Sequence, residues 1–192
     1  MIHLEEKLKA MHILVDPTLQ IVVSENWNST IRDYRALIRH YLGDNYAPHF
    51  TREQWAQLYD LNWVPDAMKG FFSISHNQTI GGFSYSEMKH GFDVELKKRI
   101  STAILKRTSN EIEYMNAPEP EFLWVAKESG FKALGTPTNN LLLPDLICLD
   151  WESHSEKNIW SFRIKSQKTL DFRQNRGFIF SENEILYSIY YQ

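Results

Sequence analysis

One stretch of the sequence, Pro120 to Gly135, is bounded as a helix at both ends and constrains the fold more than any other stretch. Proline is favoured in the first turn of a helix, and glycine is favoured just after the last turn. In a helix, Glu128 and Lys132 lie one turn apart on the same face, which holds a carboxylate and an ammonium group in fixed register. The stretch therefore predicts a helix whose charged pair serves either a functional site or an ordinary surface ion pair.

A second charged motif lies upstream, from Gly91 to Glu95. In a strand, Asp93 and Glu95 point to the same side, while Val94 points to the other side and into a core. Together with Glu128, these carboxylates can form an all-oxygen site for a hard divalent cation such as Mg²⁺. The alternative for this motif by itself is an edge strand with one face in water.

A third motif, Ser73 to His76, precedes the other two, and the three together resemble the 4′-phosphopantetheinyl transferases, in particular the surfactin-synthetase-activating type. The most specific part is the string W-x-x-K-E-S-x-x-K-A-x-G, which begins at Trp124. The resemblance is firm from Phe71 to Gly135, about a third of the chain. It implies an enzyme, a holo-[acyl-carrier-protein] synthase. Such an enzyme transfers the 4′-phosphopantetheine arm of coenzyme A to a serine of an acyl or peptidyl carrier protein and releases adenosine 3′,5′-bisphosphate.

The resemblance also implies a role for the charged residues of these motifs. Asp93, Glu95 and Glu128 match the metal ligands of the family, and the metal is Mg²⁺. Glu128 and Lys132 are the implied catalytic residues. Glu128 is a candidate general base for the carrier serine, and Lys132 matches the lysine that stabilises or protonates the leaving phosphate.

The resemblance further implies contacts with coenzyme A from several segments of the chain: Arg35, Ser75, His76, Asp93, Lys127 and Lys132. Lys127 is expected to bind the pyrophosphate. Arg35 belongs to a basic stripe with Arg32 and Arg39, for which a solvated helix face is the alternative. His76 ends an apolar strand, where a satisfied structural histidine is the alternative. The family's upstream glycine-lysine-proline motif is not found, so no adenine pocket is predicted.

A basic run formed by Lys97, Lys98 and Arg99 follows the metal motif directly. Carrier proteins present an acidic helix beside the modified serine, and the family uses the segment after its D-x-E motif for docking. The run is therefore expected to contact the carrier protein, and a solvated charge run is the alternative.

Two other function classes stay open at this point. One is a non-catalytic relative that binds coenzyme A or the carrier protein, and the other is a metal-dependent nucleotide hydrolase that uses the same carboxylates. The sequence contains no H-E-x-x-H, no G-x-x-x-x-G-K-[ST] and no G-x-G-x-x-G motif, which gives no support to a zinc peptidase, a P-loop enzyme or a dinucleotide-binding domain.

Composition sets the remaining limits. The chain of 192 residues is 43% hydrophobic, and its net charge of −3 gives no reason to expect nucleic acid or a membrane surface as a partner. Cys148 is the single cysteine, so no internal disulfide is possible and a core position is expected. Glu5 and Glu6 interrupt any N-terminal signal peptide, and no stretch approaches the roughly 18 apolar residues of a membrane span. We therefore expect a cytoplasmic protein, and the chain length favours the monomeric type of the family.

The predicted fold class is α+β. The resemblance implies two similar small α/β halves, 1–88 and 89–192, each a mainly antiparallel sheet packed with helices. Helical patterns cover 4–11, 30–42, 51–61, 100–115 and 120–134, with a capping box expected between Thr108 and Glu111. Strand patterns cover 12–15, 20–24, 71–76, 79–86, 90–95, 141–148, 160–165, 178–181 and 185–190. The segments 71–76 and 79–86 are expected to form a hairpin, with 90–95 as its third strand.

Overall fold

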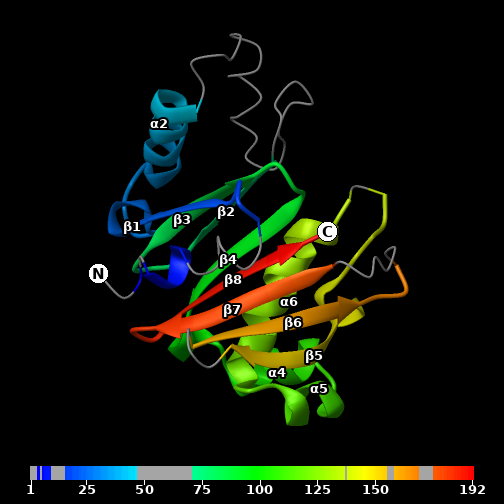
Figure 1. Cartoon of the computed structure of the whole chain (residues 1–192). Coiled ribbons are helices and arrows are strands. Elements are labelled where there is room, and N and C mark those ends of the chain that lie inside the picture. The colour runs from blue at the N-terminus through cyan, green and yellow to red at the C-terminus, as the bar shows by residue number, and fades with distance from the viewer. Residues whose placement is uncertain are drawn as a thin grey trace.

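The computed structural model describes residues 4, 6–9, 16–46, 71–136, 138–154, 158–168 and 175–192, and its elements are a mixture of helices and strands (Figure 1). The strands are β1 (Gln20–Ser24), β2 (Phe71–His76), β3 (Gly81–Ser86), β4 (His90–Leu96), β5 (Ile147–His154), β6 (Ile159–Lys165), β7 (Arg176–Glu182) and β8 (Ile185–Tyr191). The helices are α2 (Tyr34–Tyr46), α4 (Thr102–Thr108), α5 (Glu111–Asn116) and α6 (Pro120–Leu134). The patterns at 12–15 and 51–61 lie outside the described residues.

The strands form two antiparallel sheets, which confirms the mixed α and β class. The first sheet has the strand order β1-β3-β2, and the second has the order β4-β8-β7-β6-β5. The break between the sheets lies between Ser86, the last residue of β3, and His90, the first residue of β4. No helix in the part of the chain described above is both long and apolar enough to cross a membrane.

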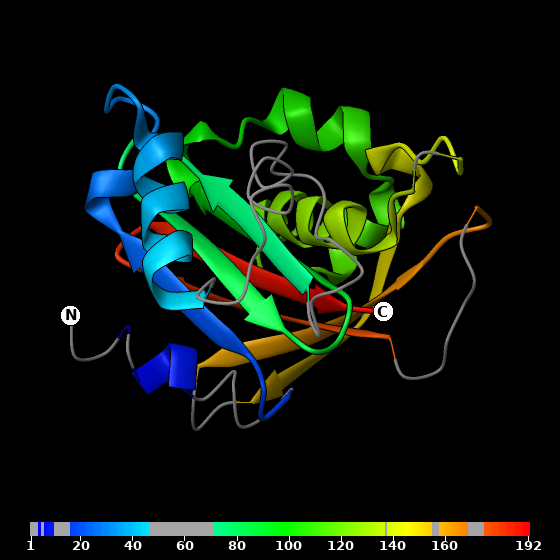
Figure 2. The ribbon, with the colours of Figure 1, turned by 90° about the horizontal axis from the view of Figure 1, so that it is seen from above.

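Helix α2 packs against the three-stranded sheet (Figure 2). Ile38 of this helix is fully buried and shares a core with Phe83 of β3 and Trp27. Tyr41 adds an edge-to-face contact with Trp27, with 5.1 Å between the ring centroids. These aromatic contacts hold the helix on one face of the sheet, because they bury large apolar surfaces with a defined geometry.

Helix α6 lies across the five-stranded sheet and packs mainly on β4 and β8 (Figure 1). Its apolar side, including Leu123 and Ala126, is buried in the largest core. The helix can approach β4 closely because residue 91 is a glycine: a Cβ atom there would overlap the Ser129 carbonyl and the Lys132 side chain. This close approach brings the charged face of α6 onto the strand that carries Asp93.

Two serine side chains join the sheets. Ser73 Oγ accepts a hydrogen bond from the Phe92 backbone N–H (2.8 Å), and Ser75 Oγ accepts one from the Val94 N–H (3.1 Å). The order of these pairs shows that β2 and β4 run in the same direction. The prediction that 90–95 is a third strand of the hairpin sheet is therefore wrong, because β4 pairs with β8 and meets β2 through hydroxyl groups.

Three predicted boundaries also change. Helix α2 begins at Tyr34, because Asn28 Oδ1 accepts a hydrogen bond from the Thr30 N–H and makes a turn, and Asp33 has a positive φ of 61°. The capping box joins Asn110 and Glu113, not Thr108 and Glu111. The strand expected at 141–148 begins only at residue 147, after a 3₁₀ turn at Leu143–Asp145.

Candidate active site

Strand β4 carries the first two carboxylates of the site. Val94 points into the core, so Asp93 and Glu95 face the other way, as the alternation of a strand requires. Asp93 is buried, and its Oδ1 accepts hydrogen bonds from Ser75 Oγ (2.7 Å) and from Lys132 Nζ (2.8 Å). Lys132 also donates to the Phe92 carbonyl at 2.9 Å. The predicted residues Ser75, Asp93 and Lys132 are thus in direct contact.

Helix α6 places Glu128 one turn before Lys132, where the charges of Lys132, Asp93 and Glu95 act on its carboxyl group. Burial raises the pKa of Glu128 to about 7, and the negative charges of Asp93 and Glu95 act in the same direction while Lys132 opposes them. A carboxyl group with this pKa is divided between its neutral and charged forms near neutral pH. It can therefore accept a proton there with more driving force than an ordinary carboxylate.

Glu95 is the third carboxylate of the candidate site. Its Oε1 accepts a hydrogen bond from the Leu96 backbone N–H at 2.8 Å and contacts Arg99 at 3.4 Å. Burial raises the pKa of Glu95, and the charge of Asp93 adds to this increase, while the Leu96 hydrogen bond and Arg99 act against it. The site therefore concentrates negative charge, which Lys132 and Arg99 partly neutralise.

The carboxylates fit a hard cation by their chemistry. Among the residues that the structure describes, no three His, Cys, Asp or Glu side chains lie close enough together to hold a metal ion in the conformation seen. The donor set of Asp93, Glu95 and Glu128 is nevertheless entirely oxygen, as Mg²⁺ prefers. Burial is the main cause of the raised pKa values of Glu95 and Glu128, and a divalent cation would relieve the repulsion by neighbouring carboxylates that adds to it.

His76 ends β2 beside these groups and contacts helix α2. Its Nε2 lies 2.6 Å from the Tyr34 hydroxyl, which also accepts a hydrogen bond from Arg35 Nε at 3.0 Å. Burial lowers the pKa of His76, and the positive charges of Arg35, Lys132 and Arg99 lower it further, while Asp93 opposes them. The predicted residues Arg35 and His76 are therefore linked to each other through Tyr34.

Tyr34 was not among the predicted site residues. Its spacing with Ile31, Leu37, Ile38 and Tyr41 is that of the apolar face of a helix, and this pattern indicates a core position and gives no signal of a site. The signal that could have found it is its phenol group, because a tyrosine hydroxyl next to a core needs a hydrogen-bond partner.

Lys127 does not join this group, and the prediction that it binds pyrophosphate is corrected. Its side chain is 0% exposed, and its ammonium donates to the Thr108 carbonyl (2.5 Å) and lies 2.8 Å from the Glu113 carboxylate. Adjacent helix residues point about 100° apart, so Lys127 faces α4 and α5 while Glu128 faces β4. Lys127 is therefore a structural residue that ties α6 to its neighbouring helices.

The basic run after β4 forms a 3₁₀ turn. Lys97 Nζ lies 2.5 Å from Glu119, and Arg99 contacts Glu95, so two of the three cations have carboxylate partners. Lys98 is exposed. The run thus lies at the edge of the candidate site, with Arg99 contributing to its charge.

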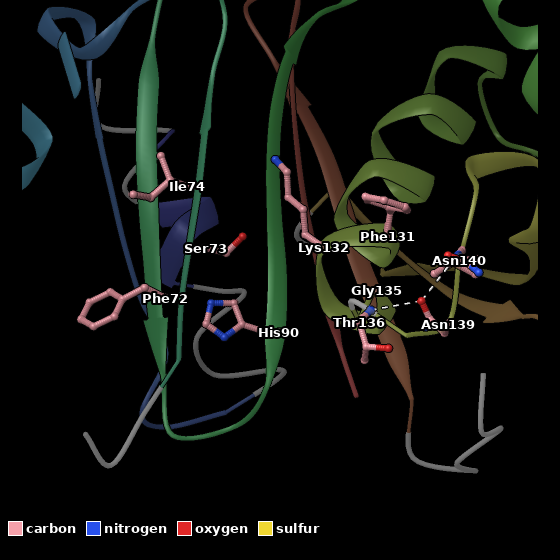
Figure 3. Close-up of a pocket in the computed structure, with 11 residues that line it drawn as sticks. Phe72, Ser73, Ile74, His90, Phe131, Lys132, Gly135, Thr136, Asn139 and Asn140 are labelled. Carbon is pink, nitrogen blue, oxygen red and sulfur yellow. Dashed lines mark hydrogen bonds between the residues drawn. The ribbon is translucent and has the colours of Figure 1, made fainter. Parts of the chain in front are cut away.

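Lys132 also lines a pocket of about 420 Å³ (Figure 3). Its wall combines apolar and polar side chains: Phe72, Ser73, Ile74, His90, Phe131, Lys132, Gly135, Thr136, Asn139, Asn140 and Leu141. Lys132 connects the pocket to the three carboxylates, because it lines the pocket and also donates to Asp93. A small molecule held in the pocket would therefore lie beside a cation.

Comparisons with known proteins do not assign the chain to a family. No model of a known protein family matches the chain, and the search of curated proteins finds no match.

Proposed function

We propose that the protein is a 4′-phosphopantetheinyl transferase that moves the phosphopantetheine arm of coenzyme A to a serine of an acyl or peptidyl carrier protein. The observation that carries the proposal is the group formed by Glu128, Asp93, Glu95 and Lys132. These residues come from two elements distant in the sequence, and they combine a carboxyl group of pKa about 7 with two further carboxylates and an ammonium group. Transfer of a phosphoryl group needs this combination of a base and charge neutralisation.

In the proposed reaction, Glu128 takes the proton of the carrier serine. The serine oxygen forms a bond to the phosphorus that carries the pantetheine arm, and the bridging P–O bond of the pyrophosphate breaks. Adenosine 3′,5′-bisphosphate then leaves. Lys132 would neutralise the charge that develops on the leaving phosphate, since its ammonium is held at this point by Asp93 and the Phe92 carbonyl.

Mg²⁺ is the metal ion that the proposal includes, with Asp93, Glu95 and Glu128 as the residues that would hold it. When bound, it would neutralise the pyrophosphate oxygens and act as a Lewis acid. The all-oxygen donor set supports this assignment, as does the effect of the Asp93 charge on both Glu95 and Glu128, which shows that the carboxylates lie near one another.

The phosphates of coenzyme A would lie near Arg35, Ser75, His76 and Lys132. Three positive side chains act on His76, which makes the site attractive to an anion. The pocket beside Lys132 offers room for another part of the coenzyme.

The wider proposal follows the family. It comprises a cytoplasmic monomer built of two similar α/β halves, 1–88 and 89–192, whose carrier protein docks near Lys97, Lys98 and Arg99. Support for the halves comes from the division of the strands into two sheets, one packed with α2 and the other with α6.

The test is mass spectrometry of carrier proteins incubated with the protein, coenzyme A and Mg²⁺. A carrier that gains the mass of a phosphopantetheine group on its serine would support the proposal, and the Glu128→Gln variant should give no such product. Binding of coenzyme A without transfer to any acyl or peptidyl carrier would point to the non-catalytic alternative. Hydrolysis of simple nucleotides without coenzyme A binding would point to a hydrolase.

A further inference from the structure

The hydroxyl group of Tyr34 lies between a permanent donor and a histidine. Arg35 Nε donates to the Tyr34 oxygen at 3.0 Å, and the same oxygen lies 2.6 Å from His76 Nε2. The tyrosine ring also packs edge to face on the imidazole, with 4.5 Å between the centroids. Tyr34 therefore fixes both the position of the His76 ring and the partner of one ring nitrogen.

The direction of these hydrogen bonds follows from the chemistry of the three groups. A guanidinium group can only donate, so the Tyr34 oxygen is an acceptor toward Arg35. The proton of the hydroxyl stays available, and donating it to His76 Nε2 uses every group of the pair, with Nε2 accepting through its lone pair. A neutral imidazole that accepts at Nε2 carries its proton on Nδ1. The opposite tautomer would leave both the Tyr34 proton and the Nδ1 lone pair without a partner among the residues that the structure describes.

His76 Nδ1 is a buried atom, and no acceptor for it is found within the part of the chain that the structure describes. A buried donor without an acceptor is costly, so an acceptor supplied by a ligand would be favourable. Among the described residues, the charged groups that act on this ring are the cations Arg35, Lys132 and Arg99 and the anion Asp93. This surrounding favours an anionic acceptor, such as a phosphate oxygen.

We propose that Tyr34 is a positioning residue of the site, which holds His76 as the Nδ1–H tautomer so that this N–H can donate to a phosphate oxygen of the ligand. The identity of the ligand rests on the proposed function, whereas the tautomer does not. Tyr34 acts only through His76, and it has no contact with the transferred group.

The first experiment is ¹⁵N NMR of the imidazole nitrogens in the whole protein. Signals of His76 are assigned with the His76→Asn variant. The wild type should show a protonated Nδ1 and an unprotonated Nε2, and Tyr34→Phe should change this ratio because the donor to Nε2 is lost. Tyr41→Phe, on the same helix, is the control and should leave the ratio unchanged. A wild-type His76 with its proton on Nε2 would overturn the inference.

The second experiment measures binding of coenzyme A and of adenosine 3′,5′-bisphosphate by isothermal titration. Loss of one neutral hydrogen bond is expected to weaken both ligands about fivefold to tenfold in Tyr34→Phe. The amide N–H of asparagine lies near the position of Nδ1, so His76→Asn should keep part of the affinity, and adding Tyr34→Phe to it should cost nothing more. His76→Gln places its amide near Nε2 instead and should bind more weakly than His76→Asn.

The outcomes separate the inference from the proposed function. An equal loss from Tyr34→Phe in the wild-type and His76→Asn backgrounds would overturn the positioning role, because Tyr34 would then act independently of His76. A wild-type protein that binds neither nucleotide would overturn the proposed function and the ligand part of the inference. In that case the NMR ratio would still decide whether Tyr34 sets the tautomer.

Discussion

Replacing Glu128 with glutamine should stabilise the metal-free protein at high pH while it removes activity. In the folded protein, burial and the charges of Asp93 and Glu95 raise the pKa of this carboxyl from 4.5 to about 7, against the opposing effect of Lys132. In the unfolded chain the pKa returns to its ordinary value. Between these two values the folded state binds more protons than the unfolded state, so the free energy of unfolding falls as the pH rises from 4.5 to 7 and stays low above 7.

The size of the effect follows from the pKa difference. A change from 4.5 to about 7 corresponds to about 3 kcal/mol of stability that the wild type loses at pH 8. Glutamine has nearly the same volume and cannot ionise, so Glu128→Gln should avoid this loss. We expect the variant to be more stable than the wild type by about 3 kcal/mol at pH 8, and by less than about 1 kcal/mol at pH 5.

The assay is urea denaturation with a chelator present, at both pH values. Glu87→Gln is the control, because Glu87 is exposed and lies outside the site, and its stability should follow the wild type at both pH values. Saturating Mg²⁺ should stabilise the wild type more than Glu128→Gln, since the variant lacks one of the proposed ligands. The reasoning would be refuted by a Glu128→Gln variant that is less stable than the wild type at pH 8, or whose difference is the same at both pH values.

Three further predictions concern single lysines. Lys132→Ala should lower turnover far more than coenzyme A affinity, because in the proposed reaction its ammonium acts on charge that develops in the transition state. Steady-state kinetics and a titration of coenzyme A would measure both, and an equal loss in the two would contradict this role. Lys98→Glu should raise the KM for the carrier protein and leave that for coenzyme A unchanged, with an effect that shrinks as salt rises, and the exposed Lys165→Glu is the control. Lys127→Met should lower the free energy of unfolding by about 3 to 5 kcal/mol in urea denaturation, because it leaves the Glu113 carboxylate buried without its cation. Adding Glu113→Gln to this variant should recover part of the loss, and no recovery would contradict a structural role of the pair.

The elements that could be predicted from the sequence are those with local signals. Helix α6 was predicted from Pro120 to Gly135 because its proline, its glycine and its apolar spacing all lie within the helix. Strands β2, β6, β7 and β8 were predicted because β-branched and aromatic residues alternate between turn residues. Such signals depend on neighbouring residues in the chain, so they need no knowledge of the fold.

The partner of β4 could not be predicted in the same way. Strand β4 follows β3 after a short connection, and sequential strands commonly pair, which favoured a three-stranded meander. It pairs instead with β8, nearly a hundred residues later, and the side chains of Ser73 and Ser75 replace the ladder toward β2. Nothing local distinguishes a serine that accepts a backbone hydrogen bond from one that faces water.

For the site, the sequence predicts which residues of α6 share a face, but not what that face contacts. The spacing of Glu128 and Lys132 places them on one face of α6 in any fold, and this pair lies with Asp93 in the structure. Lys127 is adjacent to Glu128 in the motif, but it points to Glu113 because the rotation of α6 is set by what packs around it. A motif therefore predicts which residues of a helix act together only when they are three or four positions apart, and the residue next to them needs the structure.

The buried pair of Lys127 and Glu113 gives this rotation a physical basis. Glu113 accepts hydrogen bonds from the Asn110 and Cys148 backbone N–H groups as well as from Lys127, so one carboxylate connects α5, the edge strand β5 and α6. Rotating α6 would break this buried contact and would also turn Lys132 away from Asp93. Lys127 thus belongs to the same motif as Glu128 for a different reason than predicted: it holds the helix in the orientation in which Glu128 and Lys132 face β4.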